Sequence, residues 1–165
     1  MSNAHLQQNS AKSTSFLFTV TNRKDLSFKI QNSSVGSVNL GAAPFPMRAI
    51  DALVPGNKLD FGPMNLRVLM SEGLTEWFDL YKWMIEITKS NAAHLDNVET
   101  AELTVLDSQN REVMRFIYTG VFPLTLGELT YSLVDEEETL VADLAITFDK
   151  MDVVNLITGE ELIYE

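Results

Sequence analysis

The sequence predicts a mainly β protein, an antiparallel β-sandwich or barrel with one flanking α-helix and a long arm. Apolar and polar residues alternate with period two over about seven or eight short segments. Only one segment repeats apolar residues at helical spacing. A proline-rich stretch, residues 41–63, interrupts the strands. The 165 residues suffice for one core, so we expect a flexible N-terminal arm at 1–15 and a single β domain at 16–165.

The first alternating segments occupy residues 16–20 and 26–30. The residues between them, 22–25, are typical of a turn, so the pattern predicts a hairpin. A further extended piece is expected at 35–40. Residues 64–71 alternate again and predict another strand, with its apolar positions on one face.

The stretch at residues 41–63 is the predicted long arm. It holds four of the five prolines and three of the eight glycines, so we expect an irregular segment that does not join the core as a regular strand. Its apolar content argues against disorder and predicts burial against another subunit. The residues expected at that contact are Phe45, Met47, Ile50, Leu53, Val54, Leu59 and Phe61.

The one predicted helix covers residues 74–88, where apolar residues recur every three or four positions. Thr75 is the expected N-cap. Trp77, Phe78 and Tyr81 form an aromatic stripe on this helix. We expect the stripe to pack on a sheet; a shelf for a ligand is the alternative.

The second half of the sequence predicts two hairpins. Strands at 101–107 and 112–121 flank a turn at 108–110. Phe122-Pro123 should then break the ladder, because proline donates no amide hydrogen. Strands at 129–134 and 139–148 form the last predicted hairpin, around the acidic turn at 135–138.

The last predicted strand has two different faces. One face carries the core-type residues Leu140, Ala142, Leu144, Ile146 and Phe148. The other face is small, polar or acidic, as expected where one side of an antiparallel sheet meets water. Its residues are Thr139, Val141, Asp143, Ala145, Thr147 and Asp149.

The charge distribution disfavours nucleic-acid binding. The net charge is −11, and residues 51–165 hold 22 of the 23 acids against seven of the 12 bases. Such a field repels phosphates, although solubility alone would also explain it. No apolar run approaches membrane-spanning length, and the first 15 residues lack the apolar core of a secretory signal.

The residues give no indication of catalysis or of a cofactor. The chain has no cysteine, and its two histidines, His5 and His94, lie in expected loops. Residues 135–138 lack the oxygen spacing and central glycine of an EF-hand. Hydrolase, zinc-protease and phosphate-loop motifs are missing from the sequence. We therefore expect a protein that is not an enzyme and that needs neither a metal nor a cofactor.

Two stretches carry a family resemblance. Gly120-Val121-Phe122-Pro123 precedes Gly127-Glu128-Leu129 and the acidic turn, and residues 59–61 lead through 70–72 to a helix with Trp77 and Trp83. This order and spacing, over residues 16–152, resembles the tail tube protein family of contractile-tailed bacteriophages. Phe122 stands where the family has tryptophan.

The resemblance implies a structural subunit of six-membered rings that stack into a hollow tube inside a contractile sheath. Each subunit of the family adds strands to a barrel wall, and its long arm reaches the adjoining ring. The implied partners are further copies of the chain, the tail sheath protein, a tape-measure protein in the lumen and DNA in transit, with no membrane. The implied location is the virion tail, assembled in the host cytoplasm.

Other assignments stay open at this point. A tube initiator of the baseplate, or the inner tube of a type VI secretion system or a contractile bacteriocin, would need a similar fold. A monomeric acidic β-barrel that binds a ligand is the alternative from another class. In a tube, we expect Thr139, Val141, Asp143, Ala145 and Thr147 to face the lumen, where Asp143 would add a negative charge. An outer surface or a subunit seam is the alternative for this face.

Overall fold

The computed structural model describes residues 15–23, 30–48, 50–89, 98–133 and 139–163. The predicted N-terminal arm, apart from Ser15, and the acidic turn at 135–138 lie outside these residues. The described part has ten strands and one helix. They are β1 (Phe16–Val20), β2 (Ile30–Ser33), β3 (Val38–Pro46), β4 (Asp51–Phe61), β5 (Met64–Leu69), α3 (Thr75–Lys89), β6 (Glu99–Leu106), β7 (Glu112–Leu126), β8 (Val141–Thr147), β9 (Lys150–Asn155) and β10 (Glu160–Leu162).

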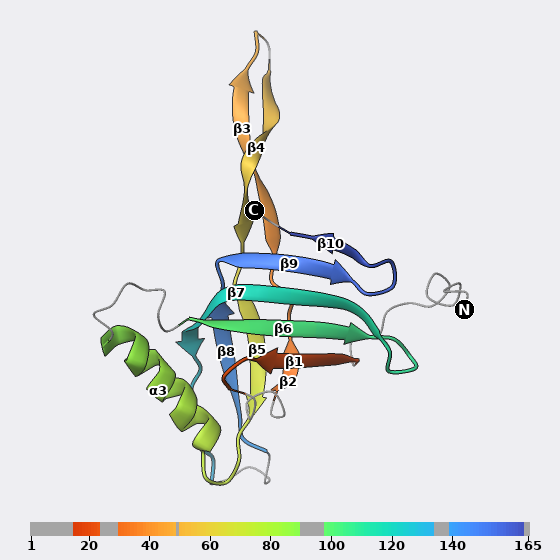
Figure 1. The fold of residues 1–165 in the computed structure, drawn as a ribbon. Helices are drawn as coiled ribbons and strands as arrows, with labels where there is room; N and C mark the ends of the chain where they lie inside the picture. Colours follow the sequence, from red (N-terminus) through yellow and green to blue (C-terminus); the bar gives the residue numbers. More distant parts are fainter. Residues whose placement is uncertain (1–14, 24–29, 49, 90–97, 134–138, 164–165) are drawn as a thin grey trace.

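Two antiparallel layers form the body of the protein. The first contains β1, β6, β7, β9 and β10 in this order, and the second contains the end of β7, then β8, β5 and β2. Figure 1 shows the strands of the two layers running across one another, with α3 at one side of the body and the β3–β4 hairpin projecting from it. The predicted fold class, a mainly β antiparallel sandwich with one flanking helix and a long arm, is confirmed.

Strand β7 belongs to both layers. Its first part pairs with β6 and β9, and its last residues, 122–126, pair with β8. Gly120 has φ = 71°, and a Cβ at this position would collide with the Asp149 carboxylate, so the change of layer requires glycine. The ladder with β6 ends at Val121, as predicted, but the strand itself continues through Phe122-Pro123 to Leu126, so its predicted end at Val121 is wrong. Pro123 pairs with Ile146, and the register shifts just after it, which is how an antiparallel ladder accommodates a proline.

The core lies between the two layers. The predicted core face of the last strand is confirmed, since Ala142, Leu144 and Ile146 are each 1% exposed. They lie among residues of β1, β5, β6 and β7 that are equally buried. Tyr118 of β7 is fully buried there, and its hydroxyl donates a hydrogen bond to the Val35 carbonyl at 3.1 Å. This burial raises the pKa of Tyr118.

The strand pairing differs from the expectation at both ends of the chain. Strand β1 pairs with β6, and Ile30, the one described residue of the predicted second strand, pairs with Val68 of β5. Residues 129–133 form no strand, and β8 pairs with β5 and with the end of β7. The predicted hairpin of 129–134 with 139–148 is therefore wrong, because alternation reveals which face a residue occupies but not which strand lies beside it. The predicted hairpin of 101–107 with 112–121 is confirmed by the pairing of β6 with β7. The predicted second strand of the first hairpin lies, apart from Ile30, outside the described residues.

Helix α3 buries a narrower face than predicted. Leu80 and Trp83 are 1% exposed, whereas Phe78 and Tyr81 are 63% and 47% exposed, so the predicted packing of the aromatic stripe is wrong for these two. Trp77 is half-buried and stacks on Tyr81, with 5.3 Å between the ring centroids. Thr75 is the first helical residue, and Leu74 accepts the first helical hydrogen bond, so the N-cap lies one residue earlier than predicted.

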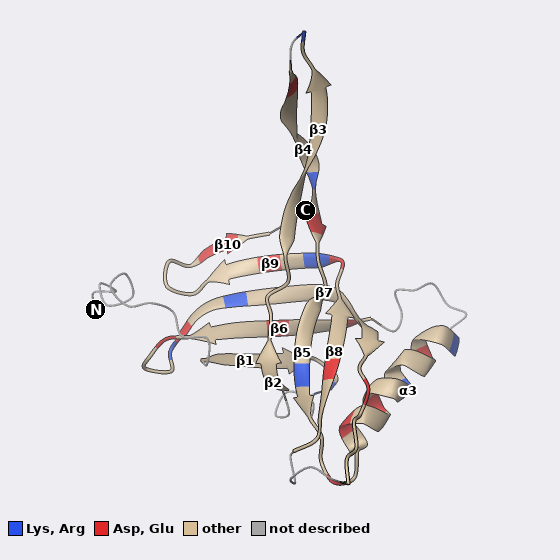
Figure 2. Ribbon diagram, turned by 180° about the vertical axis from the view of Figure 1, so that it is seen from behind, with Lys and Arg blue, Asp and Glu red and all other residues tan. Residues whose placement is uncertain are grey.

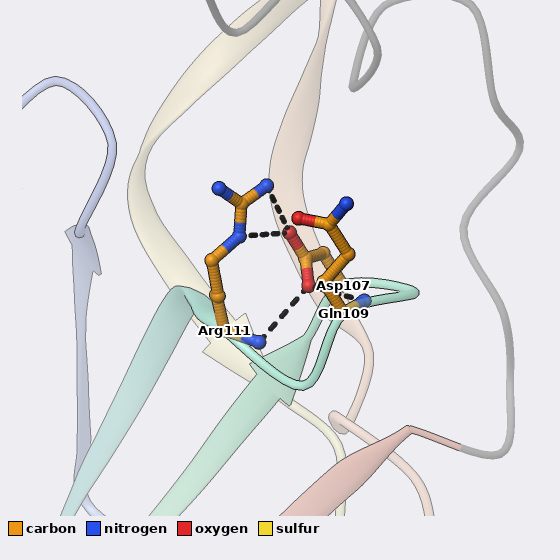
Figure 3. A network of polar contacts seen from close by, with 3 residues as sticks. All are labelled: Asp107, Gln109 and Arg111. Carbon is orange, nitrogen blue, oxygen red and sulfur yellow. Dashed lines mark hydrogen bonds and ion pairs between the residues drawn. The ribbon is translucent and has the colours of Figure 1, made fainter. Parts of the chain in front are cut away.

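The β6–β7 turn is fixed by a carboxylate. Asp107, whose side chain is 4% exposed, accepts hydrogen bonds from the backbone amides of Gln109 and Arg111 at 2.7 and 2.9 Å (Figure 3). The Arg111 guanidinium closes the network at 2.8 and 2.9 Å. The pKa of Asp107 is lowered from its usual 3.8 to about 2. The main cause is the hydrogen bond from the Arg111 backbone amide. The bond from the Gln109 amide lowers the pKa further, whereas burial acts in the opposite direction.

This turn predicts a pH-dependent contribution to stability. Because the pKa of Asp107 is depressed in the folded state, its ionised carboxylate adds to the free energy of unfolding above pH 3.8. This stabilisation is lost as the pH falls towards 2. We expect Asp107→Asn to lower the urea midpoint of unfolding at pH 6, and the difference from the natural protein to shrink steadily between pH 4 and pH 2. Urea titrations at four pH values measure this. A difference that is constant across the series would contradict the assignment.

Candidate assembly surfaces

The predicted arm is a β-hairpin that stands clear of the body (Figure 1). Strands β3 and β4 pair with each other from Val38 opposite Phe61 to Pro46 opposite Asp51, and they form a sheet of their own. The expectation of an irregular segment is wrong, because the prolines lie on a two-stranded ribbon in which both strands are edges. The expectation that the segment does not join the core as a regular strand holds, since β3 and β4 form a separate sheet and, of the described residues, only Phe61 at its base packs against the core.

Apolar side chains cover both faces of this hairpin. Phe45 and Val54 are 54% and 42% exposed, and Leu53, which points to the opposite face, is 74% exposed. Met47, Ile50 and Leu59, also predicted for the arm contact, are 57%, 73% and 37% exposed. A two-stranded hairpin is marginally stable in water by itself. Exposed apolar surface on two faces is typical of interaction sites.

An aromatic cluster anchors the arm to the body. Phe61, the seventh predicted contact residue, is half-buried at the base of the arm, and its ring lies 5.6 Å from that of Phe148. Phe148 in turn lies 4.8 Å from the buried Tyr118 ring. The Gly62 amide also donates to the Ser37 carbonyl at 2.8 Å, which closes the base of the hairpin. The arm is therefore rooted in the core that joins the two layers.

Proline limits how the arm can bind a partner. Pro44 and Pro46 lie on β3 and Pro55 lies on β4, so β3 lacks two backbone amide hydrogens and β4 lacks one. A partner strand that paired with either edge would lose these hydrogen bonds. The arm is therefore suited to contacts through side chains and not to strand addition.

The second candidate surface is the outer face of the second layer. Here the protein has an open groove of about 620 Å³, and most of its lining residues are either small or polar. The lining residues are Asn32, Ser34, Asn65, Leu66, Arg67, Thr125, Gly127, Asp143, Leu144 and Ala145. Of the residues predicted to face a lumen, Asp143 and Ala145 line the groove. Val141 and Thr147 are half-buried residues of the same strand, and the exposed Thr139 precedes it.

Asp143 is not an isolated negative charge. Arg67 lies directly opposite it on β5, and the Arg67 Nε donates to the Asp143 Oδ1 at 3.1 Å. Among the described residues that line the groove, Arg67 and Asp143 are the charged ones, one of each sign. Both side chains are at least half exposed, so the pair contributes about 0–1 kcal/mol to stability. Its effect is mainly to balance the charge of this surface.

Sequence reasoning missed Arg67, although a signal for it was present. Met64, Leu66 and Val68 alternate on β5, and all three are buried. The residues between them, Asn65 and Arg67, must then occupy the outer face of this strand. What the pattern could not supply is the register that places Arg67 beside Asp143.

No site for chemistry emerges from the residues that the structure describes. Within residues 15–23, 30–48, 50–89, 98–133 and 139–163, no group of three potential metal ligands comes together. His5 and His94 lie outside these ranges. In the same ranges, no helix is long and apolar enough to cross a bilayer.

Comparison with known proteins gives one relative by sequence. No protein-family model matches the chain. The tail tube terminator protein of Enterobacteria phage T4 is 27% identical over 101 residues, which are 57% of this chain and 57% of the phage protein. The match therefore spans little more than half of that relative.

Solved structures share the fold over nearly the whole chain. The sheath–tube complex of the extracellular contractile injection system PVC has a chain with a TM-score of 0.71 and 15% identity, covering 94% of this chain and 99% of that one. The tube-terminating cap of the anti-feeding prophage gives 0.70 and 13%, over 90% and 93%. Hcp1 from Flavobacterium johnsoniae gives 0.52 and 14%, over 91% and 99%. At these identities the likeness concerns the fold.

The two kinds of comparison agree with each other. The sequence match leads to a tail tube terminator of a phage, and the structural matches lead to a sheath–tube complex and a tube-terminating cap of contractile or prophage systems and to an Hcp1 protein. The chain has the fold of the tube proteins of contractile injection systems, and its resemblance to the tail tube protein family of contractile-tailed bacteriophages is confirmed.

Proposed function

We propose that the chain is a structural subunit of a contractile tail tube that forms stacked, six-membered rings around a channel. The observation that carries this proposal is the apolar hairpin arm, which projects from a body with the tube-protein fold. A monomer would leave that surface in water, which favours aggregation. The exposed arm therefore also argues against the monomeric binding module.

The arm would connect one ring to the next. Its apolar residues lie on both faces, its prolines disfavour strand pairing, and its base is anchored in the core. A rooted hairpin of this kind transmits force to the body when its outer part is held by a neighbour. Ring closure would use the free edges of the layers, because unpaired edge strands are the usual sites of strand addition.

The outer face of the second layer would line the channel. The residues that line its groove are mostly small or polar, and Arg67 and Asp143 in that groove neutralise each other. Such a surface offers little attraction to a passing polymer of either sign. DNA in transit and a tape-measure protein are the cargo that the family resemblance implies, and the tail sheath protein would surround the tube. Assembly would take place in the host cytoplasm before the tail joins the virion.

A tube terminator is the second candidate. The curated relative carries that name, and one of the structural matches is a tube-terminating cap. A terminator would form one ring at the end of a tube, whereas a tube subunit would stack on itself without limit. The self-assembly of the purified protein separates the two candidates.

Removal of the arm should abolish stacking. We expect the purified chain to form rods at high concentration with a crowding agent, and a variant without residues 45–59 to stop at single rings or monomers. Circular dichroism should show the same β content in the body of both proteins, because the deleted residues make no core contact. Sedimentation and negative-stain microscopy measure the outcome. Rods from the variant would exclude the arm from stacking, and single rings from the natural chain would favour the terminator.

The paired charge in the groove should control DNA retention. Asp143→Asn leaves Arg67 unpaired, so we expect assembled protein to retain more DNA at about 50 mM salt and to lose that excess near 200 mM. Asp143→Lys should retain still more. Arg67→Gln combined with Asp143→Asn should return retention to the natural level, since neither charge remains. Co-sedimentation of DNA with assemblies measures the effect. Unchanged retention in Asp143→Asn and Asp143→Lys would exclude this face from the channel.

A further inference from the structure

The arm divides into two ribbons with different registers. Its proximal half consists of residues 38–40 and their partners 59–61, and its distal half consists of residues 42–46 and their partners 51–55. The register shifts between the two halves, so the ladder of one half does not continue into the other. Figures 1 and 2 show β3 and β4 crossing one another partway along the arm. The direction of the distal half is therefore set where the register shifts.

The two strands contribute different numbers of residues to this shift. On β3 only Gly41 lies between the two halves, whereas on β4 residues 56–58 lie between them. Three residues thus face one, which makes the shift a β-bulge on β4. A bulge bends the longer strand and increases the twist of the ribbon. We name Gly41 together with residues 56–58 the joint of the arm.

The backbones of β3 and β4 approach each other closely at the two glycines of the joint. A Cβ added to Gly56 would lie 2.5 Å from the carbonyl oxygen of Gly41 and 2.9 Å from its carbonyl carbon. Both are backbone atoms, so they cannot swing aside as the end of a side chain would. A Cβ added to Gly41 would meet no atom of the described residues within 4 Å. Neither glycine has a positive φ, so the close approach is what requires glycine at position 56.

The distal half is stiffer than the joint. It contains Pro44, Pro46 and Pro55, which are all the prolines of β3 and β4. Proline fixes φ at about −65°, so these positions resist bending. The joint contains two glycines, and glycine has the widest backbone freedom of any residue. A change in the direction of the arm is therefore concentrated at the joint.

We infer that the contact between Gly41 and Gly56 sets the direction of the distal half, and that Gly56 is the residue that positions it. A side chain at position 56 would push the two strands apart at the joint. The distal half, with its exposed Phe45, Leu53 and Val54, would then turn away from its present direction. The joint is a property of the single subunit, whereas its consequence for assembly rests on the proposed function.

Two alanine variants test the joint, because they make the same chemical change on the two sides of one contact. Gly56→Ala adds a methyl group that collides with the opposite backbone, whereas Gly41→Ala adds one that points into open space. Pairs of spin labels can report the direction of the arm, since the chain has no cysteine of its own. Labelled protein would be diluted with excess unlabelled protein, so that every measured distance lies within one subunit.

The labels would join the tip of the arm to two sides of the body. One label would be placed at Met47→Cys, beside the end of β3, and the other at Ser108→Cys or Lys82→Cys. All three positions are exposed. Ser108 belongs to the β6–β7 turn and Lys82 to α3, and these two elements lie on opposite sides of the body (Figure 1). A turn of the distal half in any direction across the body therefore changes at least one of the two distances.

We expect Gly56→Ala to shift one or both tip-to-body distances by about 6 Å, because a turn of about 20° moves the end of a ribbon about 17 Å long by that amount. Gly41→Ala should leave both distances as they are in the natural chain. Distances from Asp60→Cys, in the proximal half, should be the same in all three proteins. Circular dichroism should show an unchanged body, since the joint lies outside the core.

Three results would overturn the inference. Unchanged tip distances in Gly56→Ala would show that the close contact does not direct the distal half. An equal shift in Gly41→Ala would show that the loss of any glycine has this effect. A shift that also appears at Asp60→Cys would place the turn at the base of the arm and not at the joint.

Assembly gives a separate readout of the same variants. Gly56→Ala should raise the protein concentration needed for rods by about tenfold or more, because a misdirected arm must be reoriented before it can bind. Gly41→Ala should assemble like the natural chain. Equal assembly of all three proteins, with the tip shifted in Gly56→Ala, would exclude a role of the joint in assembly. If the natural chain forms neither rings nor rods, the proposed function fails, whereas the distances still decide whether Gly56 directs the arm.

Discussion

Apolar packing between the two crossing layers is the interaction on which the rest of the structure depends. It buries one face of β5 and β8 against β1, β6 and β7, and it holds β7 in the bend at Gly120 that joins the layers. The same core continues through Tyr118 and Phe148 to Phe61, at the base of the arm. Two surfaces take no part in this packing and remain for function. One is the polar outer face of the second layer. The other is the arm, which projects too far from the body for its side chains to be buried against it.

Sequence patterning predicted the faces of the strands better than their partners. Alternation in residues 140–148 separated the buried Leu144 and Ile146 from the exposed Asp143, because side-chain direction in a strand is a local property. The pairing of β1 with β6, about 80 residues away, is not local and was not predicted. The hairpin of β6 with β7 is local and was predicted correctly, whereas the hairpin predicted at 129–148 was wrong because β8 pairs with the distant β5 and with the end of β7. The break of the β6 ladder before Pro123 was predicted correctly, but the continuation of β7 beside β8 was not. A proline at a change of partner strand looks the same in sequence as a proline that ends a strand.

The two candidate surfaces, the arm and the groove, could be predicted only in part, because they also depend on which strands pair. The apolar residues of the arm were recognisable because seven of them lie among prolines and glycines, where a core strand is unlikely to form. Their arrangement on a hairpin depended on pairing and was missed. Asp143 was placed on the correct face, but its partner Arg67 lies 76 residues earlier, so the neutral groove could not be derived from the acidic net charge. The excess of acids in the chain therefore lies outside this groove. Solubility explains that excess as well as repulsion of DNA does.

Hydrogen exchange of the arm would test whether its exposed surface is an assembly interface. Exchange of the backbone amides in residues 38–61 would be followed in dilute protein and in the assembled fraction, with β5 and β8 as internal references. We expect the arm amides to exchange rapidly in dilute protein, because a two-stranded hairpin is marginally stable alone, and to slow by at least about tenfold on assembly, while the reference strands change little. Equal exchange of the arm in both states would contradict the view that this hairpin holds the assembly together.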